Sequence, residues 1–234
     1  GSGKLAMNTI KKIKGKVYAF DDHGRMLSGL QVSDTTNYGR KDFSNDAGND
    51  NSYQDLTGEQ FANLSLTGKD IFFFSDDPAK DGSRKTGYQN VSFDDDTYQM
   101  YFNNNGKAAK DYVKKIKKYA QNGIVLKANN DDSNYAVVPV SGTSGAAVET
   151  IAPVHDKAVL YYGDADFNTT SQVLINTAGT VQKKKFNLKD SNDVYYVTDN
   201  NGVVIYASMK KLYTASSNDH SNSVTVGGTT YYTE

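Results

Sequence analysis

Short apolar runs alternate with polar turn residues along the whole chain, and many of the turns end in a glycine. The repeated phrase is an aromatic or aliphatic run, a few polar residues and Gly, from VYAFDDHG near the start to VYYVTDNNG near the end. Short runs bounded by turn residues are typical of β-strands, whereas helices need longer periodic segments. The pattern therefore predicts hairpins, whose turn glycines are Gly24, Gly82, Gly106, Gly123, Gly179 and Gly202.

Three of these glycines directly follow an asparagine, at Asn105, Asn122 and Asn201. Asparagine and glycine both tolerate positive φ. An Asn-Gly pair between two apolar runs therefore favours a type I′ turn, whose twist matches that of the flanking strands. We expect two-residue hairpin turns at all three pairs.

The turn glycines recur at intervals that suit one hairpin and its connector. Gly106 follows Gly82 by 24 residues, Gly202 follows Gly179 by 23, and Gly227 follows Gly202 by 25. A single two-stranded hairpin is only marginally stable in water, so the apolar faces of neighbouring hairpins must cover one another. The sequence predicts an all-β fold of tandem β-hairpin repeats in a β-solenoid-like array, with irregular loops and little helix.

Two long intervals between turn glycines interrupt the repeat. The tract 38–55 is almost entirely polar and is interpreted as an exposed loop. Two apolar residues three positions apart allow one or two helical turns over 57–64. Segment 107–119 has some helical spacing, but we favour a strand that turns at 122–123. Further strands are predicted at 135–140 and 158–163.

These signals divide the chain into six segments. The Gly-Ser-Gly start is interpreted as a remnant of an expression vector and not as part of the fold. The segments are this start with an N-terminal connector (1–14), a first repeat (15–31), a diverged or inserted loop-rich segment (32–67), a run of repeats (68–130), a diverged repeat (131–170) and the C-terminal repeats (171–234).

The composition excludes several kinds of chemistry. Of 234 residues, 37% are hydrophobic, and the aromatic residues are 17 Tyr and 10 Phe with no Trp. The formal net charge of −1 gives no basis for binding nucleic acid. No apolar stretch approaches the roughly 18 residues that a membrane span needs, so we expect no membrane insertion. The chain has no cysteine, so its stability has to come from packing and not from disulfides.

No residue pattern indicates catalysis. His23, His155 and His220 lie in polar surroundings, and no acid stands at a recognised spacing from them. The chain has no Gly-x-Ser-x-Gly motif for a nucleophilic serine, and its paired aspartates fall where turn formation explains them. We therefore expect no catalytic residue and no enzyme activity.

One Asp-rich segment begins like a calcium-binding loop. The acidic and amide residues from Asp164 have the EF-hand spacing, but Thr169 and Ile175 occupy the positions that require Gly and a bidentate Glu. We therefore expect no metal ligand in this segment, and no cofactor. A less regular calcium site within the 44–55 loop is an alternative that the sequence does not exclude.

Two segments carry a family resemblance. GKVYAFDDHGRMLSGLQ at 15–31 and GKDIFFFSDDPAKDGSRKTGYQ at 68–89 share a Gly-Lys start, an aromatic run and an acidic turn, and both have a second glycine five residues after the turn glycine. They resemble the cell-wall-binding repeats of Gram-positive surface proteins, the choline-binding and glucan-binding repeat family. The resemblance implies a solenoid of β-hairpins in a secreted protein associated with the cell wall.

For the choline-binding branch, the resemblance implies aromatic cages between adjacent hairpins that hold a quaternary ammonium group. The position that opens the aromatic run is usually Trp in that family, and here it holds Val17, Ile71 and Gln99. The resemblance therefore supports the hairpin scaffold more than a choline pocket, and choline is a doubtful ligand.

Tyr and Phe rings give the remaining binding signal, because flat aromatic faces stack on sugar rings. We expect a non-catalytic module that binds cell-wall polysaccharide or teichoic acid through shallow aromatic sites between repeats. The alternative is a structural spacer or protein-interaction array of an adhesin or toxin, in which the aromatic residues only pack between hairpins. The candidate ligand-binding aromatics are Tyr18, Phe20, Phe72, Phe74, Tyr88, Tyr101, Tyr161, Tyr162, Tyr195 and Tyr196.

Overall fold

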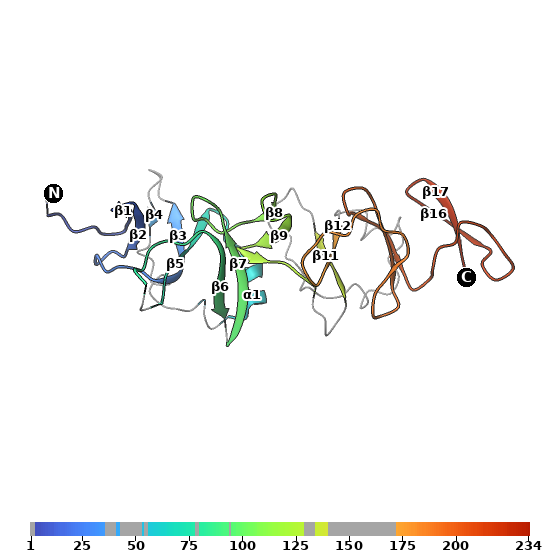
Figure 1. The fold of residues 1–234 in the computed structure, drawn as a ribbon, viewed down its shortest axis with the longest axis horizontal. Coiled ribbons are helices and arrows are strands. Elements are labelled where there is room, and N and C mark those ends of the chain that lie inside the picture. Colours follow the sequence, from blue (N-terminus) through green and yellow to red (C-terminus); the bar gives the residue numbers. More distant parts are fainter. Residues whose placement is uncertain are drawn as a thin grey trace. The chain divides into compact units, whose positions relative to one another are not determined.

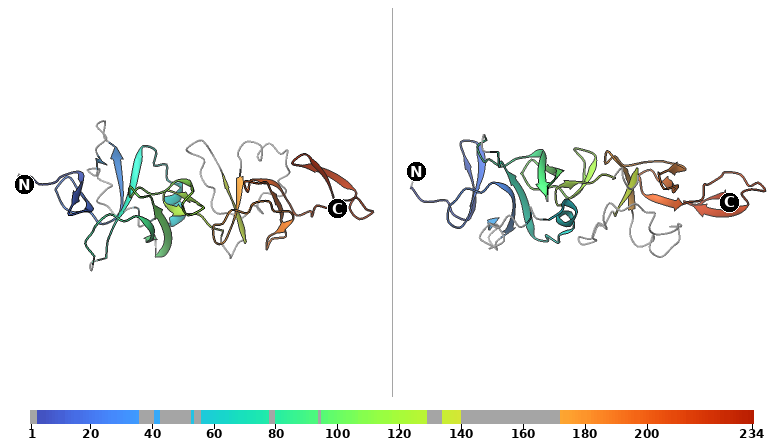
Figure 2. Two further views of the ribbon diagram at one scale, coloured as in Figure 1. Left: turned by 45° about the horizontal axis from the view of Figure 1, so that its top comes forward. Right: turned by 90° about the horizontal axis from the view of Figure 1, so that it is seen from below.

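Antiparallel strands make up almost all of the regular structure. The computed structural model describes residues 3–35, 41–42, 53, 56–77, 80–93, 95–128, 134–139 and 172–234. Across these residues the chain forms hairpins and small sheets together with one short helix, α1 (Gly58–Asn63) (Figures 1 and 2). The predicted all-β hairpin array is confirmed. In the described ranges, no helix combines the length and the apolar character that crossing a membrane requires.

The chain divides into two compact units, and the first comprises residues 1–113 with 120–125. Its sheets are the hairpin β1-β2, the three-stranded sheet β4-β3-β5 and strands of the sheet β6-β7-β10-β9-β8. The strands are β1 (Thr9–Ile13), β2 (Lys16–Phe20), β3 (Gly29–Thr35), β4 (Lys41–Asp42), β5 (Lys69–Phe74), β6 (Gly87–Phe93), β7 (Asp96–Phe102), β8 (Asp111–Val113), β10 (Ile124–Val125) and, at the boundary of the units, β9 (Lys118–Gln121).

The second unit comprises residues 114–119 with 126–234. It contains two hairpins, β11-β12 and β16-β17, and the three-stranded sheet β13-β14-β15. The strands are β11 (Tyr135–Pro139), β12 (Gln172–Asn176), β13 (Leu188–Lys189), β14 (Tyr195–Thr198), β15 (Val204–Ser208), β16 (Asn222–Val226) and β17 (Thr229–Thr233).

One five-residue turn recurs in both units. The N–H of Asp199 donates to the carbonyl of Val203 (2.9 Å), and its carbonyl accepts from the N–H of Gly202 (3.2 Å). The Asp199 carboxylate also accepts from the N–H groups of Asn201 and Val203, each at 2.8 Å. This is a type I turn followed by a left-handed residue. The same two backbone bonds close the turns at 21–25, 103–107, 176–180, 190–194 and 199–203.

The first residue of each of these turns is Asp or Asn, and in four of the turns its side chain caps the backbone. Oδ1 of Asp21, Asn176 and Asp190 accepts two backbone N–H groups, as Oδ1 of Asp199 does. Asp and Asn side chains imitate a backbone turn in this way. In the phrases that end at Gly24, Gly106, Gly179 and Gly202, a second fixed position therefore lies three residues before the glycine, which the glycine spacing alone did not reveal.

The turn glycine is required for packing as well as for backbone conformation. Gly202 has a φ of 91°, and a Cβ there would overlap the side chain of Val181, which lies two residues after the preceding turn glycine. Gly106 meets Arg84 in the same way. Four of the turn glycines thus lie against the residue that follows a preceding turn. These stacking contacts pair Gly82 with Met26, Gly106 with Arg84, Gly123 with Ala108, and Gly202 with Val181.

The structure confirms a two-residue hairpin turn at one Asn-Gly pair and corrects the other two. Asn122 (φ 45°) and Gly123 (φ 93°) are both left-handed and join β9 to β10, so segment 107–119 leads into a hairpin as expected. The type I′ turns expected at Asn105 and Asn201 are wrong, because only the glycines that follow them have positive φ. Each of these asparagines is the third residue of the recurrent five-residue turn.

Three other local predictions can be compared with the structure. The helix expected over 57–64 is α1, and the strand expected at 135–140 is β11. Two residues of the tract 38–55, which was expected to be a loop, form strand β4 instead, because they pair with β3. The predicted strand at 158–163 lies outside the described residues, as does the 44–55 loop of the calcium alternative except for Tyr53.

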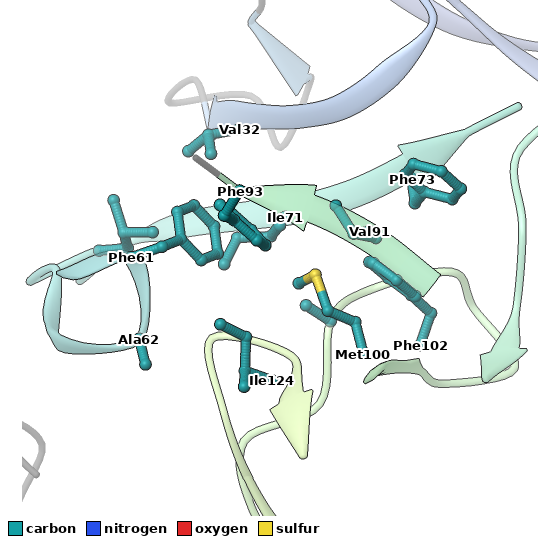
Figure 3. Close-up of a cluster of buried hydrophobic side chains, with 12 residues drawn as sticks. Val32, Phe61, Ala62, Ile71, Phe73, Val91, Phe93, Met100, Phe102 and Ile124 are labelled. Carbon is teal, nitrogen blue, oxygen red and sulfur yellow. The ribbon is translucent and has the colours of Figure 1, made fainter. Parts of the chain in front are cut away.

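The larger core cluster of the first unit brings α1 and the inner face of the β6-β7 hairpin together with residues of β3, β5 and β10 (Figure 3). Phe61 of α1 packs on Phe93 of β6, with ring centroids 4.9 Å apart. A Cβ at Gly58 would overlap the ring of Tyr98, so the helix lies directly against β7. Thr57 begins the helix with a capping box, which satisfies N–H groups that a short helix otherwise leaves without partners.

The C-terminal end of α1 is capped by a side chain from a distant hairpin turn. The amide of Asn122 donates from Nδ2 to the carbonyl oxygens of Phe61 (3.0 Å), Ala62 (3.1 Å) and Leu64 (3.0 Å). Asn122 is only 5% exposed. The last carbonyls of a helix have no partner within the helix, so this amide ties the inserted helix to the repeat scaffold.

A buried tyrosine–aspartate pair lies in the core of the second unit. Tyr196 of β14 is fully buried and packs with Leu174 and Val204. Its hydroxyl donates to Oδ2 of Asp190 at 3.1 Å, and the other oxygen of Asp190 caps its own turn. Burial, and then the neighbouring Asp190 carboxylate, raise the pKa of Tyr196 far above its ordinary value. The Tyr196 side chain is therefore structural, and its hydroxyl stays protonated as a hydrogen-bond donor.

Candidate functional site

The ten candidate aromatic residues have different environments. Tyr161 and Tyr162 lie outside the described residues. Tyr88 has an open ring, with 42% of the residue exposed. The half-buried rings are Tyr18, Phe20 and Tyr195. The buried rings, which pack within their own unit, are Phe72, Phe74, Tyr101 and Tyr196.

Tyr88 is held in place by a second tyrosine. It pairs across the β6-β7 hairpin with Tyr101, and the two rings meet edge to face with centroids 5.2 Å apart and planes at 74°. Tyr101 is only 3% exposed, so it is fixed by packing. Burial, and then the neighbouring Tyr101, raise the pKa of Tyr88, so its hydroxyl is neutral at physiological pH. A fixed, half-open ring is a surface on which a ligand can stack with little loss of side-chain entropy.

Tyr195 has a different neighbour, because a lysine lies over its ring. Nζ of Lys189 is 5.6 Å from the ring centroid and 2.6 Å from a carboxylate oxygen of Asp193. Nζ of Lys211 lies 5.5 Å from the ring centroid of Tyr213 in the same geometry. An ammonium group over an aromatic face makes the contact that a quaternary ammonium ligand would make. At these two rings, a cationic ligand would compete with the chain's own lysines.

Two further aromatic pairs in the second unit were not among the predicted site residues. Phe186, which is 45% exposed, packs against Tyr231 with centroids 5.2 Å apart. Tyr213 stacks on His220 with centroids 4.0 Å apart. Phe186 and Tyr213 lie outside the repeated phrase, so the glycine pattern did not point to them. The adjacent tyrosines at 231–232 were a usable signal, because neighbouring residues of a strand face opposite sides.

One group of possible metal ligands is found among the described residues, at Asp21, Asp22 and His23. The Asp21 carboxylate already accepts from the N–H groups of His23 and Arg25 and from Nε of Arg25 at 2.7 Å. Burial raises the pKa of Asp21, but the hydrogen bonds from Arg25 outweigh this and leave it below its ordinary value. Turn capping therefore accounts for this carboxylate without a metal.

Comparisons with known proteins give a weak likeness to solved structures. No family model matches the chain, and no curated protein matches it. The chain is similar to CbpJ from Streptococcus pneumoniae TIGR4, with 12% identity over 84% of this chain and 48% of that one and a TM-score of 0.33. It is also similar to choline binding protein F from Streptococcus pneumoniae in the presence of a peptidoglycan analogue, with 13% identity, coverage of 87% and 48%, and a TM-score of 0.33.

A third similar structure is ASR alternansucrase in complex with isomaltononaose, with 15% identity over 97% of this chain and 13% of that one and a TM-score of 0.29. The chain spans about half or less of the length of these three structures. Likeness at these TM-scores assigns neither a family nor a ligand. The functional argument therefore depends on the residues of this chain.

Proposed function

We propose that the chain is a non-catalytic module that binds cell-wall polysaccharide or teichoic acid at a bacterial surface. The observation that carries the proposal is the half-open ring of Tyr88, fixed edge to face on a buried tyrosine in a β-hairpin. Each shallow site of this kind binds weakly. A polymer that contacts several sites on one chain gains affinity through effective concentration, without any deep pocket.

The rings of Tyr195 and Tyr213 do not favour choline as a ligand. Lysine side chains lie over the faces of Tyr195 and Tyr213, and the positions that are Trp in the family that these repeats resemble hold other residues in this chain. Sugar rings need no empty cation site, because their apolar faces stack on the aromatic ring and their hydroxyls bond to polar neighbours. We therefore propose that the chain recognises the sugars of the polymer and not choline groups.

A structural spacer is the second candidate, and one observation favours it. Half of the eight candidate aromatics that the structure describes are buried: Phe72, Phe74, Tyr101 and Tyr196. Those rings stabilise the hairpins and offer no surface to a ligand. The two functions differ in a simple property, which is whether the folded chain binds cell-wall material at all.

Sedimentation of the full chain with purified sacculi separates the two functions. We expect saturable binding that excess free choline does not reverse. Sacculi stripped of teichoic acid form the second arm: retained binding indicates polysaccharide, and lost binding indicates teichoic acid. If the folded chain stays in the supernatant with both kinds of sacculi and with insoluble glucan, the binding function is wrong and the spacer remains.

A further inference from the structure

The β6-β7 hairpin has two faces of different chemistry. Val91 and Phe93 of β6, with Met100 and Phe102 of β7, point into the core (Figure 3). Because side chains alternate along a strand, the residues between them point the other way. The outer face consists of Tyr88, Asn90 and Ser92 of β6 and Thr97, Gln99 and Tyr101 of β7.

Strand register sets these six side chains in three cross-strand pairs. Tyr88 is opposite Tyr101, Asn90 is opposite Gln99, and Ser92 is opposite Thr97. Successive pairs on one face are about 6.6 Å apart, since a strand rises about 3.3 Å per residue. The outer face is therefore a strip about 13 Å long, with a ring at one end, amides in the middle and hydroxyls at the other end.

The middle pair supplies hydrogen-bonding groups that have no partner among the described residues. Asn90 and Gln99 are both exposed, and neither side-chain amide bonds to another group within the described ranges of the chain. Each amide offers two donors and an acceptor, which suits the neighbouring hydroxyls of a sugar. The hydroxyls of Ser92 and Thr97 lie 3.4 Å apart beside them.

We propose that this outer face binds an uncharged polysaccharide, with Tyr88 stacking on one sugar and Asn90 and Gln99 bonding to the hydroxyls of the next. The inference rests on the proposed function, and it names the site and the class of polymer. Five of the six residues of this face are exposed, and Tyr101 is buried behind the ring of Tyr88. A fixed ring beside exposed amides is a pre-organised surface, so little side-chain entropy is lost on binding.

The charge at the turn end of the face favours a neutral polymer over an anionic one. The outer face has no Asp, Glu, Lys, Arg or His, and the raised pKa of Tyr88 keeps its hydroxyl protonated at neutral pH. Asp95 and Asp96 are exposed at the end of the hairpin where β6 turns into β7. Their charge repels a phosphate-bearing polymer such as teichoic acid, and has no such effect on an uncharged glycan.

The test compares variants of the full chain for binding to insoluble neutral glucan and to sacculi stripped of teichoic acid. Asn90→Ala with Gln99→Ala removes the amides and leaves both rings and the inner core in place. We expect binding at least about tenfold weaker, because two hydrogen bonds are lost. Tyr88→Ala should weaken binding by a similar factor, and Tyr88→Phe should retain most of it because the ring remains.

Asn201→Ala is the matched control, since it removes an exposed amide in the other unit. Thermal unfolding confirms that every variant is folded. If the parent chain binds and the Asn90→Ala, Gln99→Ala variant binds equally well, the assignment of this face is wrong while the proposed function stands. Binding that requires teichoic acid also overturns the assignment. If the parent chain binds none of these polymers, the proposed function and this assignment are both wrong.

Discussion

Single side chains decide how each recurrent turn is closed. Asp199 accepts two backbone N–H groups with one oxygen, and Asp21, Asn176 and Asp190 do the same in their turns. These groups would otherwise bond to water, and the turn would lose its preference for one conformation. The same side-chain cap therefore stabilises four of the recurrent turns.

Removal of one cap should lower stability in proportion to the two hydrogen bonds lost. We expect Asp199→Ala to reduce the free energy of unfolding of the second unit by about 1–2 kcal/mol. Asp199→Asn keeps an acceptor and should cost much less. Asn200→Ala, in the same turn, is the control. Urea unfolding followed by circular dichroism measures all three, and equal midpoints for Asp199→Ala and the parent would contradict the role of the cap.

Asp21 adds a pH dependence to its turn. Its pKa in the folded chain is below the ordinary 3.8, so its carboxylate stabilises the fold above that pH. This contribution is lost as the pH falls through 3.8 and on through the lowered pKa. We expect the urea midpoint of the parent to fall in this acid range more steeply than that of Asp21→Asn. Parallel curves for the two proteins would show that the carboxylate contributes nothing.

Neighbouring hairpins are joined by packing contacts that the sequence pattern predicts only in part. The stacking contact of Gly202 on Val181 combines positive φ with close approach, whereas Gly228 has a φ of 81° and nothing within 4 Å of a Cβ. These two glycines share the backbone requirement and differ in packing. Comparing them separates the two reasons for which a turn needs glycine.

Alanine should therefore have unequal effects at the two positions. We expect Gly228→Ala to cost about 1–2 kcal/mol, from backbone strain alone. Gly202→Ala should cost about 1–3 kcal/mol more, from the overlap with Val181. Adding Val181→Ala to Gly202→Ala should recover part of that excess. Urea midpoints of the parent, Gly202→Ala, Val181→Ala and the double variant measure the coupling, and its absence would mean that the neighbouring hairpin moves away without cost.

The helix α1 depends on a side chain from another element in the same way. Asn122→Asp would place a carboxylate against three carbonyl oxygens, and we expect it to destabilise the first unit by about 2–4 kcal/mol. Asn122→Gly keeps the left-handed backbone and loses only the amide, so its cost should be smaller. Hydrogen exchange at α1 reports the effect locally, and unchanged protection in Asn122→Asp would contradict the capping role.

The sequence made the hairpins visible because glycine is the default residue where φ is positive, and the short apolar runs leave no room for long helices. It did not show which face each residue occupies. Gln99 stood out only as a replaced Trp position, and its place opposite Asn90 depends on the register of β6 against β7. The helix cap by Asn122 spans about 60 residues of sequence, so no local pattern could indicate it.

For the whole molecule, balanced charge is the property most relevant to binding. With 26 basic and 27 acidic residues, the chain has no net field to attract an anionic polymer. Contacts through stacking and neutral hydrogen bonds are hardly screened by salt, whereas ion pairs at the surface are. The kind of polymer should therefore be apparent from the salt dependence of binding by the full chain.

We expect the dissociation constant for stripped sacculi or neutral glucan to change by less than about twofold between about 50 and about 500 mM NaCl. Sedimentation at several salt concentrations measures this, with a lysine-rich peptide on teichoic acid as the salt-sensitive control. Affinity that falls steeply with salt would show that charge carries the interaction, and would favour the anionic polymer.

The residue type at the fourth position of the recurrent turn is related to whether another segment of the chain packs there. Where that residue is Gly24, Gly106, Gly179 or Gly202, a Cβ added to it would overlap another segment of the chain. The turn that begins at Asp190 has Asp193 instead, at a φ of 64°, and its side chain pairs with Lys189. At this turn the fourth position therefore holds a side chain that pairs within its own hairpin, in place of the room that glycine leaves for another segment.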